Sequence, residues 1–266
     1  MCNSKNISVV LKEFEQLLQL KYSGRTPANY LYHVKLFLNY SDNVPLRVNN
    51  EDILNYNISI RNKSNSFRNV AINAIKSYFK LYLRKQVKGF SSIRPPKEYK
   101  KPKVYDCYIL SEKIQNIENK KHKAILALSL CCWLRKSELL NIKISDINGS
   151  LMTLKINQSK GCKDRVVIIS ENTINILREY HKEYKPKEYL FEGLNGGKYS
   201  STSVDKITKK YLYKDMRFHS LRASGATFAL SNGTDLKTVS KILGHKHIQT
   251  TEYYIPILYK TIKQAI

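Results

Sequence analysis

The sequence predicts a mainly α-helical protein of two domains, with a small β hairpin or sheet in the second. Apolar residues recur at helical spacing through most of the 266 residues. Two short β-prone runs, 151–157 and 165–170, lie close together and predict a hairpin. A basic stretch with three prolines and little apolar periodicity, 84–103, separates the halves. We therefore predict three segments, a helical domain at 1–90, a linker at 91–105 and a second domain at 106–266.

The chain is strongly basic in both halves. Lys and Arg number 46 against 21 Asp and Glu, so the formal net charge is +25 and the pI about 9.8. Up to Lys103 there are 19 basic and 6 acidic residues, and after it 27 and 15. Both halves are therefore expected to contact a polyanion such as nucleic acid. The alternative source of this charge is an A+T-rich genome, which favours Lys, Asn, Ile and Tyr.

Cysteine usage and hydropathy exclude several classes of protein. The five cysteines are odd in number and lack C-x-x-C spacing, so neither a disulfide framework nor a zinc knuckle is expected. Cys131 and Cys132 lie in the apolar run AILALSLCCWL and are expected to be small buried residues. There is no apolar signal core, and no run approaches the ~18 apolar residues of a membrane span. A cytoplasmic protein without a membrane partner is expected.

Four amphipathic helices are predicted in the first domain. They are expected in ISVVLKEFEQLLQL (7–20), NYLYHVKLFLNY (29–40), EDILNYNI (51–58) and NSFRNVAINAIKSYFKLYLRK (65–85). Thr26 can cap the second helix with Pro27 at its first position, and Asn49 or Asn50 can cap the third. No strand pattern interrupts them, which favours a four-helix domain.

In the second domain, the apolar run ending in CCWL predicts a buried helix that breaks near Trp133. Arg135 follows this break, and burying its guanidinium would require a carboxylate or phosphate partner. Pairing with Glu138 or Asp146 is the structural alternative to a catalytic role. Beyond the hairpin, helices are predicted in NTINILREYHKEY (172–184) and SSTSVDKITKKYLYK (200–214).

The C-terminal window from 219 to 254 combines two histidines, an arginine and two adjacent tyrosines. His219 and Arg222 are three apart, so on a helix they share one face, with Cβ atoms about 5–6 Å apart. Leu236, Val239, Ile242 and Leu243 repeat at helical spacing, and Gly244 stands where a helix commonly ends in a left-handed residue. His245 is therefore expected in a turn.

A short helix is expected next. Thr250 and Thr251 can cap it, and Tyr253 and Tyr254 would lie on its first turn.

These residue types suit phosphodiester cleavage, which needs charge stabilisation, an in-line nucleophile and a proton for the leaving oxygen. Arginines offer planar forks that match phosphate oxygens, histidines move protons, and a tyrosine can attack phosphorus. A two-metal nuclease is not favoured, because Asp106, Asp146 and Asp164 are scattered rather than clustered. No metal or other cofactor is expected.

At this point the motifs resemble those of the tyrosine recombinases, the phage-integrase and Xer-like enzymes. The His-x-x-Arg at 219–222, the Leu-Gly-His ending at His245 and a tyrosine nine residues later resemble the family's C-terminal signature. LRKSELLNIKISDI resembles its first arginine motif, with Trp133 in place of a glycine. SKGCKDR resembles its hairpin pattern Gly-Lys-Gly-x-Lys-x-Arg, with Ser159 in place of the first glycine. SGRTPANYLYHVKLFLNY and the Ser-Phe-Arg helix look like its helical, SAM-like core-binding domain.

The resemblance implies a set of catalytic residues. They are Arg135, Lys160, His219, Arg222, His245 and the nucleophile Tyr254. The nine-residue count selects Tyr254 over Tyr253, and Lys163 is the rival of Lys160. The implied chemistry is site-specific cutting and rejoining of DNA through a 3′-phosphotyrosine, with Lys160 protonating the leaving 5′-oxygen.

The resemblance also implies an architecture and partners. Two domains would form a C-shaped clamp on double-stranded DNA in the nucleoid, and four protomers, monomeric or dimeric off DNA, would act on two duplexes. The tail IPILYKTIKQAI (255–266) has apolar residues at roughly helical spacing and would dock in trans on a neighbouring protomer, or in cis on its own domain. The alternatives in function are a type IB-like topoisomerase and a catalytically silent DNA-binding accessory protein.

Overall fold

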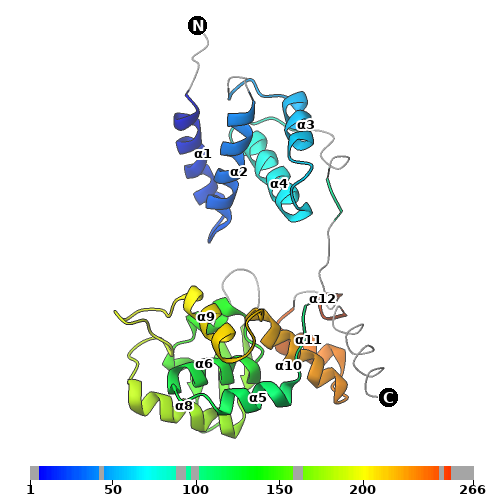
Figure 1. Cartoon of the computed structure of the whole chain (residues 1–266). Helices are drawn as coiled ribbons and strands as arrows, with labels where there is room; N and C mark the ends of the chain where they lie inside the picture. The colour runs from blue at the N-terminus through cyan, green and yellow to red at the C-terminus, as the bar shows by residue number, and fades with distance from the viewer. Residues whose placement is uncertain are drawn as a thin grey trace. The chain divides into compact units, whose positions relative to one another are not determined.

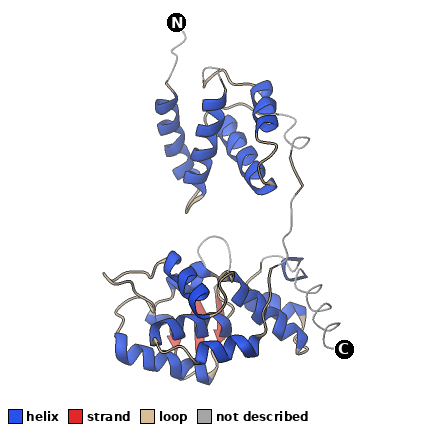
Figure 2. Cartoon of the chain, viewed as in Figure 1, coloured by secondary structure: helices blue, strands red, loops and turns tan. Residues whose placement is uncertain are grey.

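The computed structural model describes residues 6–41, 45–87, 94–96, 102–157, 164–245 and 249–252. The chain divides into two compact units, Met1–Lys100 and Lys101–Ile266, each with its own hydrophobic core (Figure 1). Helices dominate both units, and the strands of the described residues lie in the second (Figure 2). The mainly helical fold with a small sheet is confirmed. No helix of the described segments is long and apolar enough to cross a membrane.

Unit 1 contains the four predicted helices. They are α1 (Ile7–Lys21), α2 (Thr26–Tyr40), α3 (Asn50–Ser59) and α4 (Asn65–Leu81). Asn49, one of the two residues predicted to cap the third helix, caps α3 through a capping box with Asp52. The capping role predicted for Thr26 was wrong: Arg25 occupies the N-cap of α2, and Thr26 is already helical, with Pro27 in the first turn.

The helices of unit 1 pack around a core of aliphatic and aromatic side chains. Phe14 of α1 is fully buried, and its ring meets the ring of Tyr78 on α4 edge-on, with centroids 5.2 Å apart. This geometry is the preferred one for aromatic pairs. Tyr78 also donates a hydrogen bond to the carbonyl of Pro45, so its hydroxyl is satisfied inside the core.

Unit 2 has a three-stranded antiparallel sheet with helices packed around it. Its elements are α5 (Cys107–Gln115), α6 (Lys120–Cys131), α7 (Lys136–Asn141), η1 (Ile144–Asp146), β1 (Ile147–Asn148), β2 (Thr153–Ile156), β3 (Arg165–Ile168), α8 (Glu171–Tyr184), α9 (Ser201–Tyr211), α10 (His219–Ser231), α11 (Leu236–Leu243) and α12 (Gln249–Glu252). The order is β1-β2-β3, with Leu154 opposite Val167 in the predicted hairpin. The two-residue β1 was not predicted.

Helix α6 is the centre of unit 2, and a turn follows it. The helix is buried from Ala124 to Ser129 and packs against α5, α8, α9 and α10. The predicted break follows at Trp133, whose φ of 49° lies in the left-handed region that disfavours a bulky residue. Its ring lies so close to Gly225 of α10 that a Cβ there would be 2.3 Å from ring atoms. The packing of this ring holds the strained turn in place.

Candidate active site

A buried carboxylate, Glu138 on α7, gathers three arginines. Arg165, at the start of β3, donates from Nη1 to Oε1 at 3.0 Å and from Nη2 to Oε2 at 2.9 Å, a bidentate pair. Arg135 donates from Nη1 to Oε1 at 2.6 Å, and Arg222 Nη1 lies 3.8 Å from Oε2. Burial raises the pKa of Glu138, but Arg165 and Arg135 outweigh it and lower the pKa overall. Glu138 is therefore an ionised carboxylate.

Arg222 links three segments of unit 2. It lies on α10, as predicted from the His-x-x-Arg spacing, and is fully buried. Its Nη1 donates to the carbonyl of Trp133 at 2.6 Å, and its Nη2 donates to the carbonyl of Leu243 at 2.5 Å. The turn after α6, the helix α10 and the end of α11 therefore meet at one guanidinium.

Arg135 is also held by hydrogen bonds to protein groups, but part of its side chain is exposed to solvent. It occupies the N-cap position of α7, and its Nη2 donates to the carbonyl of Gly244 at 3.0 Å. Its side chain keeps 33% of its surface exposed, against 6% for the Glu138 carboxylate with which it pairs. Pairing with Glu138, the structural alternative, is thus present, and it leaves part of the guanidinium open to a ligand. Asp146, the other candidate partner, instead accepts from Lys143 N and Asn157 Nδ2.

His245 follows Gly244, which ends α11 in the left-handed conformation with φ 62°, as predicted. Its Nε2 lies 3.3 Å from Arg222 Nη2, and its Nδ1 lies 2.8 Å from Thr251 Oγ1. Since a guanidinium can only donate, Nε2 accepts, and Nδ1 carries the proton towards Thr251. Burial, followed by the charges of Arg222 and Arg135, lowers the pKa of His245 to about 4. His245 is therefore neutral at pH 7.

His219 begins α10, one turn before Arg222. Its side chain has an exposed face. Loss of hydration, followed by the positive charges of Arg222 and Arg135, lowers its pKa. A second neutral imidazole therefore stands beside the arginines.

The structure thus brings together Arg135, His219, Arg222 and His245 of the predicted set. The other two, Lys160 and Tyr254, lie outside the described residues, as do Lys163, Tyr253 and the tail. One local prediction was wrong. Helix α12 begins at Gln249, so Thr250 and Thr251 are helical residues rather than its caps. Thr251 is instead the hydrogen-bond partner of His245.

Two residues that hold the site together were not assigned a role from the sequence. Glu138 was considered only as a structural partner of Arg135, and Arg165 appeared only as the last residue of the hairpin pattern. Arg165 also donates from Nε to the carbonyl of Ile242 at 2.7 Å, which ties β3 to α11. A signal was present for both. Each is a charged residue inside a motif without a role in its chemistry, and such a residue is expected to pair with an opposite charge.

Chemically, this cluster is suited to binding an anion. Three guanidiniums face one carboxylate, and both histidines are neutral, so the cluster has an excess of two positive charges. Within the described segments, no group of three or more His, Cys, Asp or Glu side chains could hold a metal ion. An oxyanion such as a phosphodiester is the ligand that the donors at Arg135 suit best.

Comparison with known proteins gives a consistent result. Residues 108–260 match the model of the phage integrase family. The chain is 32% identical to the tyrosine recombinase XerA of Pyrococcus horikoshii and 31% identical to that of Pyrococcus furiosus, in each case over 97% of this chain and 93% of the relative.

Solved structures agree. A crystal structure of XerA recombinase is 25% identical with a TM-score of 0.55, over 97% of this chain and 98% of the other. A lambda integrase tetramer bound to a Holliday junction has a TM-score of 0.74 at 15% identity, over 95% of this chain and 78% of the other. XerH bound to its palindromic difH substrate has a TM-score of 0.73 at 20% identity, over 100% of this chain and 84% of the other. The last two likenesses concern the fold.

Proposed function

The chain belongs to the phage integrase family of tyrosine recombinases, and from this premise we propose which of its residues recombine DNA. It is a site-specific recombinase that cuts and rejoins DNA strands through a 3′-phosphotyrosine. One observation carries the assignment of its site: Glu138 fixes Arg135 beside the buried Arg222 while leaving Arg135 partly exposed. A scissile phosphate would bind at this exposed edge.

In the proposed reaction, Tyr254 is the nucleophile. Its phenolic oxygen forms a bond to phosphorus, and the bond from phosphorus to the 5′-oxygen breaks. Lys160 gives a proton to the departing 5′-oxygen, and a neutral histidine accepts the phenolic proton. The 5′-hydroxyl of the other strand then attacks the phosphotyrosine and releases Tyr254. One ester replaces another, so no nucleotide cofactor is needed.

The protonation states support these roles. Because the pKa of His245 is lowered to about 4, its imidazole is neutral at pH 7 and can accept a hydrogen bond. Arg135 would stabilise the charge that develops on the non-bridging oxygens, and its fixed position limits the reorganisation needed during the reaction. Arg222 would act from the buried side of the same cluster.

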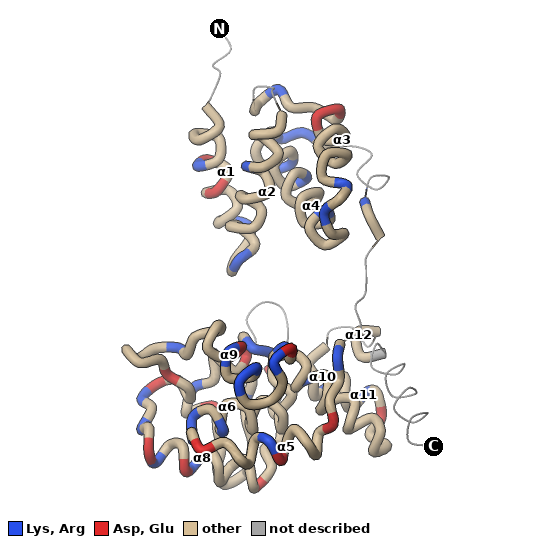
Figure 3. The backbone as a smooth tube through the Cα atoms, viewed as in Figure 1, with Lys and Arg blue, Asp and Glu red and all other residues tan. Residues whose placement is uncertain are grey.

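The partner proposed is double-stranded DNA, contacted by both units. Lys and Arg lie on helices of both units, and acidic residues are more frequent on the second (Figure 3). We assign unit 1 to DNA binding and unit 2 to catalysis. The proposed assembly is four protomers on two duplexes, with the tail 255–266 docked in trans. Its proposed location is the cytoplasm, where it binds DNA.

The experiment that tests the nucleophile uses a nicked suicide substrate, on which cleavage traps the protein on DNA. Tyr254→Phe should abolish the covalent adduct, because the attacking oxygen is gone. Tyr253→Phe is the matched control, one residue away, and should form it. The opposite result would overturn the nine-residue register. Absence of an adduct with the unmodified protein on its own site would favour the silent accessory protein.

The reaction product distinguishes a recombinase from the alternative, a type IB-like topoisomerase. The named relatives are recombinases, which favours exchange between two duplexes. Relaxation of supercoils at any sequence by a monomer, without joined products from two duplexes, would contradict the assignment.

A further inference from the structure

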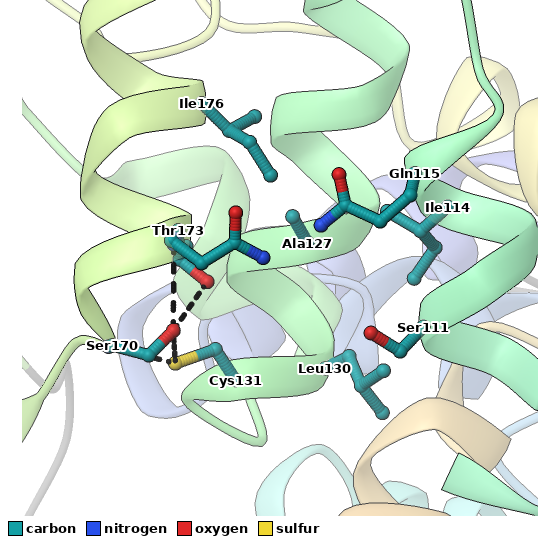
Figure 4. A pocket seen from close by; sticks show the side chains of 10 residues that line it. Ser111, Ile114, Gln115, Ala127, Leu130, Cys131, Ser170, Thr173 and Ile176 are labelled. Carbon is teal, nitrogen blue, oxygen red and sulfur yellow. Dashed lines mark hydrogen bonds between the residues drawn. The ribbon is translucent and has the colours of Figure 1, made fainter. Parts of the chain in front are cut away.

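A pocket lies between α5, α6 and α8 of unit 2, and the thiol of Cys131 forms part of its wall (Figure 4). Its volume is about 180 Å³. Gln115 and Ser111 of α5 line one side, and Ser170 and Thr173 line the other. Among the described residues that line it, none carries a Lys, Arg, Asp, Glu or His side chain. Cys131, predicted to be simply buried, is only partly buried, so the pocket gives a small molecule access to its sulfur.

The groups around Cys131 favour a thiolate. The backbone N–H of Ser170 donates to Cys131 Sγ at 3.3 Å, and Ser170 Oγ lies 3.6 Å from the same sulfur. Ser170 is the N-cap of α8, so the positive end of that helix dipole faces the sulfur. A polar hydrogen-bond donor and a helix N-terminus are the surroundings typical of reactive cysteines.

The neighbouring Cys132 has the opposite environment. It is 1% exposed, and its Sγ lies 3.8 Å from the carbonyl oxygen of Ile168. The hydrogen bond to Cys131, followed by burial, raises its pKa, although the charge of Arg165 opposes this. The hydrogen bond from Cys132, with those from Ser170 and Thr173, outweighs burial and lowers the pKa of Cys131 to about 5. Of the two, Cys131 at the pocket is therefore the more acidic thiol and Cys132 in the core the less acidic one.

We propose that Cys131 is a modification site for small disulfides and that its adduct slows DNA cleavage. The Cys131 thiolate attacks one sulfur of the disulfide; a Cys131–S–S–R bond forms, the original S–S bond breaks, and R–S⁻ leaves. The disulfide is both the oxidant and the source of the group, so atoms and electrons balance. Cys132, protonated and buried, does not displace the adduct, which persists until a thiol reductant removes it.

The coupling to catalysis runs through the turn after α6. Cys131 is the last residue of α6, and Trp133 and Arg135 follow within four residues. The carbonyl of Trp133 holds Arg222, and the Trp133 ring is packed against Gly225 with no spare room. An added group on Cys131 would replace the contacts of its sulfur with Ser170 at the start of α8, and the turn that follows α6 would lose this support.

The first test measures labelling of the full-length protein by 2,2′-dithiodipyridine at pH 5.5. An ordinary cysteine is about 0.1% thiolate at this pH, whereas a thiol of pKa about 5 is mostly thiolate. A thiolate of lower pKa is also a weaker nucleophile, which offsets part of this gain. Cys131 should therefore react roughly 15- to 30-fold faster than an ordinary thiol. Peptide mapping should place the fast label on Cys131.

Variants separate the site from general thiol chemistry. Cys131→Ser should remove the fast phase, and Ser170→Ala should slow it while leaving the cysteine in place. Cys107, whose pKa burial raises to about 11, is the internal control and should label slowly. Equal rates for Cys131 and Cys107 at pH 5.5 would overturn the proposed site.

The second test treats the protein with cystamine and measures covalent adduct formation on the nicked DNA substrate. Cleavage should fall severalfold and return after addition of dithiothreitol, and Cys131→Ser should be insensitive to cystamine. A protein fully modified at Cys131 that cleaves at the original rate would overturn the coupling. Labelling needs no DNA, so its failure is distinguishable from failure of the recombinase assignment.

Discussion

The two units differ in what they bury: both have an apolar core, and unit 2 also buries a cluster of charges. Unit 1 is built on apolar and ring contacts, of which the Phe14–Tyr78 pair is typical. Unit 2 has a large apolar core as well, but its candidate active site is organised by one buried carboxylate and three guanidiniums. Apolar packing is non-directional and tolerates adjustment, whereas a buried charge without its partner is costly. A substitution in unit 1 should therefore cost stability in proportion to the apolar surface removed, whereas removing Glu138 should disturb the positions of all three arginines of unit 2.

The largest effect is expected from Glu138→Ala. Removing this carboxylate leaves three arginines facing one another without their shared partner, which should cost about 3–5 kcal/mol and abolish the covalent DNA adduct. Hydrogen exchange in unit 2, together with the suicide-substrate assay, measures both effects. Glu179→Ala, an exposed glutamate on α8, is the matched control and should change stability by less than about 0.5 kcal/mol. Cleavage by Glu138→Ala at the original rate would show that the arginines hold their positions without it.

A loss of similar size but confined to the other unit is expected from Phe14→Ala. Truncating this fully buried ring should cost about 3–5 kcal/mol. Protection from hydrogen exchange should fall in α1 and α4 and stay unchanged in α6 and α10. Leu20→Ala is the control on the same helix, because that side chain is 86% exposed. Equal loss of protection in both units would contradict the separation of their cores.

A smaller effect should follow from Gly225→Ala. The new Cβ would lie 2.3 Å from the Trp133 ring, and such overpacking typically costs about 1–3 kcal/mol. Cleavage should slow, because the carbonyl that holds Arg222 belongs to Trp133. Gly149→Ala is the control, since nothing lies within 4 Å of a Cβ there.

The double variant Trp133→Gly, Gly225→Ala sharpens this result. It removes the clash and places a glycine at the φ of 49°. The two changes should therefore be less harmful together than their separate effects suggest. Strict additivity would show that the ring and the glycine are independent.

The smallest expected effect is a slope of stability with pH in unit 2. His245 is neutral in the folded protein, with a pKa of about 4, and takes up a proton near pH 6.5 when unfolded. Between these values the unfolded state binds more protons, so stability should fall as pH decreases from about 6.5 to about 4. His245→Asn should flatten this slope in denaturant titrations monitored in unit 2. An unchanged slope would mean that His245 is protonated in the folded state.

Local patterns in the sequence predicted the helices well. The periodicities of α1, α4 and α8 and the left-handed glycine at 244 depend on residues close together in the chain, so a short window contains the information. The helix predicted across His219 and Arg222 was confirmed for the same reason. The capping assignments for Thr26, Thr250 and Thr251 were wrong because a threonine is also acceptable inside the first turn of a helix, and the pattern does not distinguish the two positions.

Long-range contacts were not predictable in this way. Arg135 and Gly244 are 109 residues apart, and Arg165 and Ile242 are 77 apart, so no window contains both partners. The exposure of Cys131 likewise depends on how α5, α6 and α8 pack, since an apolar run around a cysteine gives the same pattern whether a pocket adjoins it or not.

The sequence by itself determined the mainly helical fold and the family, because these depend on local spacing, and its motif register predicts Tyr254 as the nucleophile. Only the tertiary structure decided that Glu138 is the common partner of Arg135, Arg165 and Arg222, and that His219 and His245 are neutral. Charge states in a partly buried site depend on desolvation and on charges brought from distant segments. The same applies to the thiolate of Cys131, whose hydrogen-bond donors come from the start of α8 and from its neighbour Cys132.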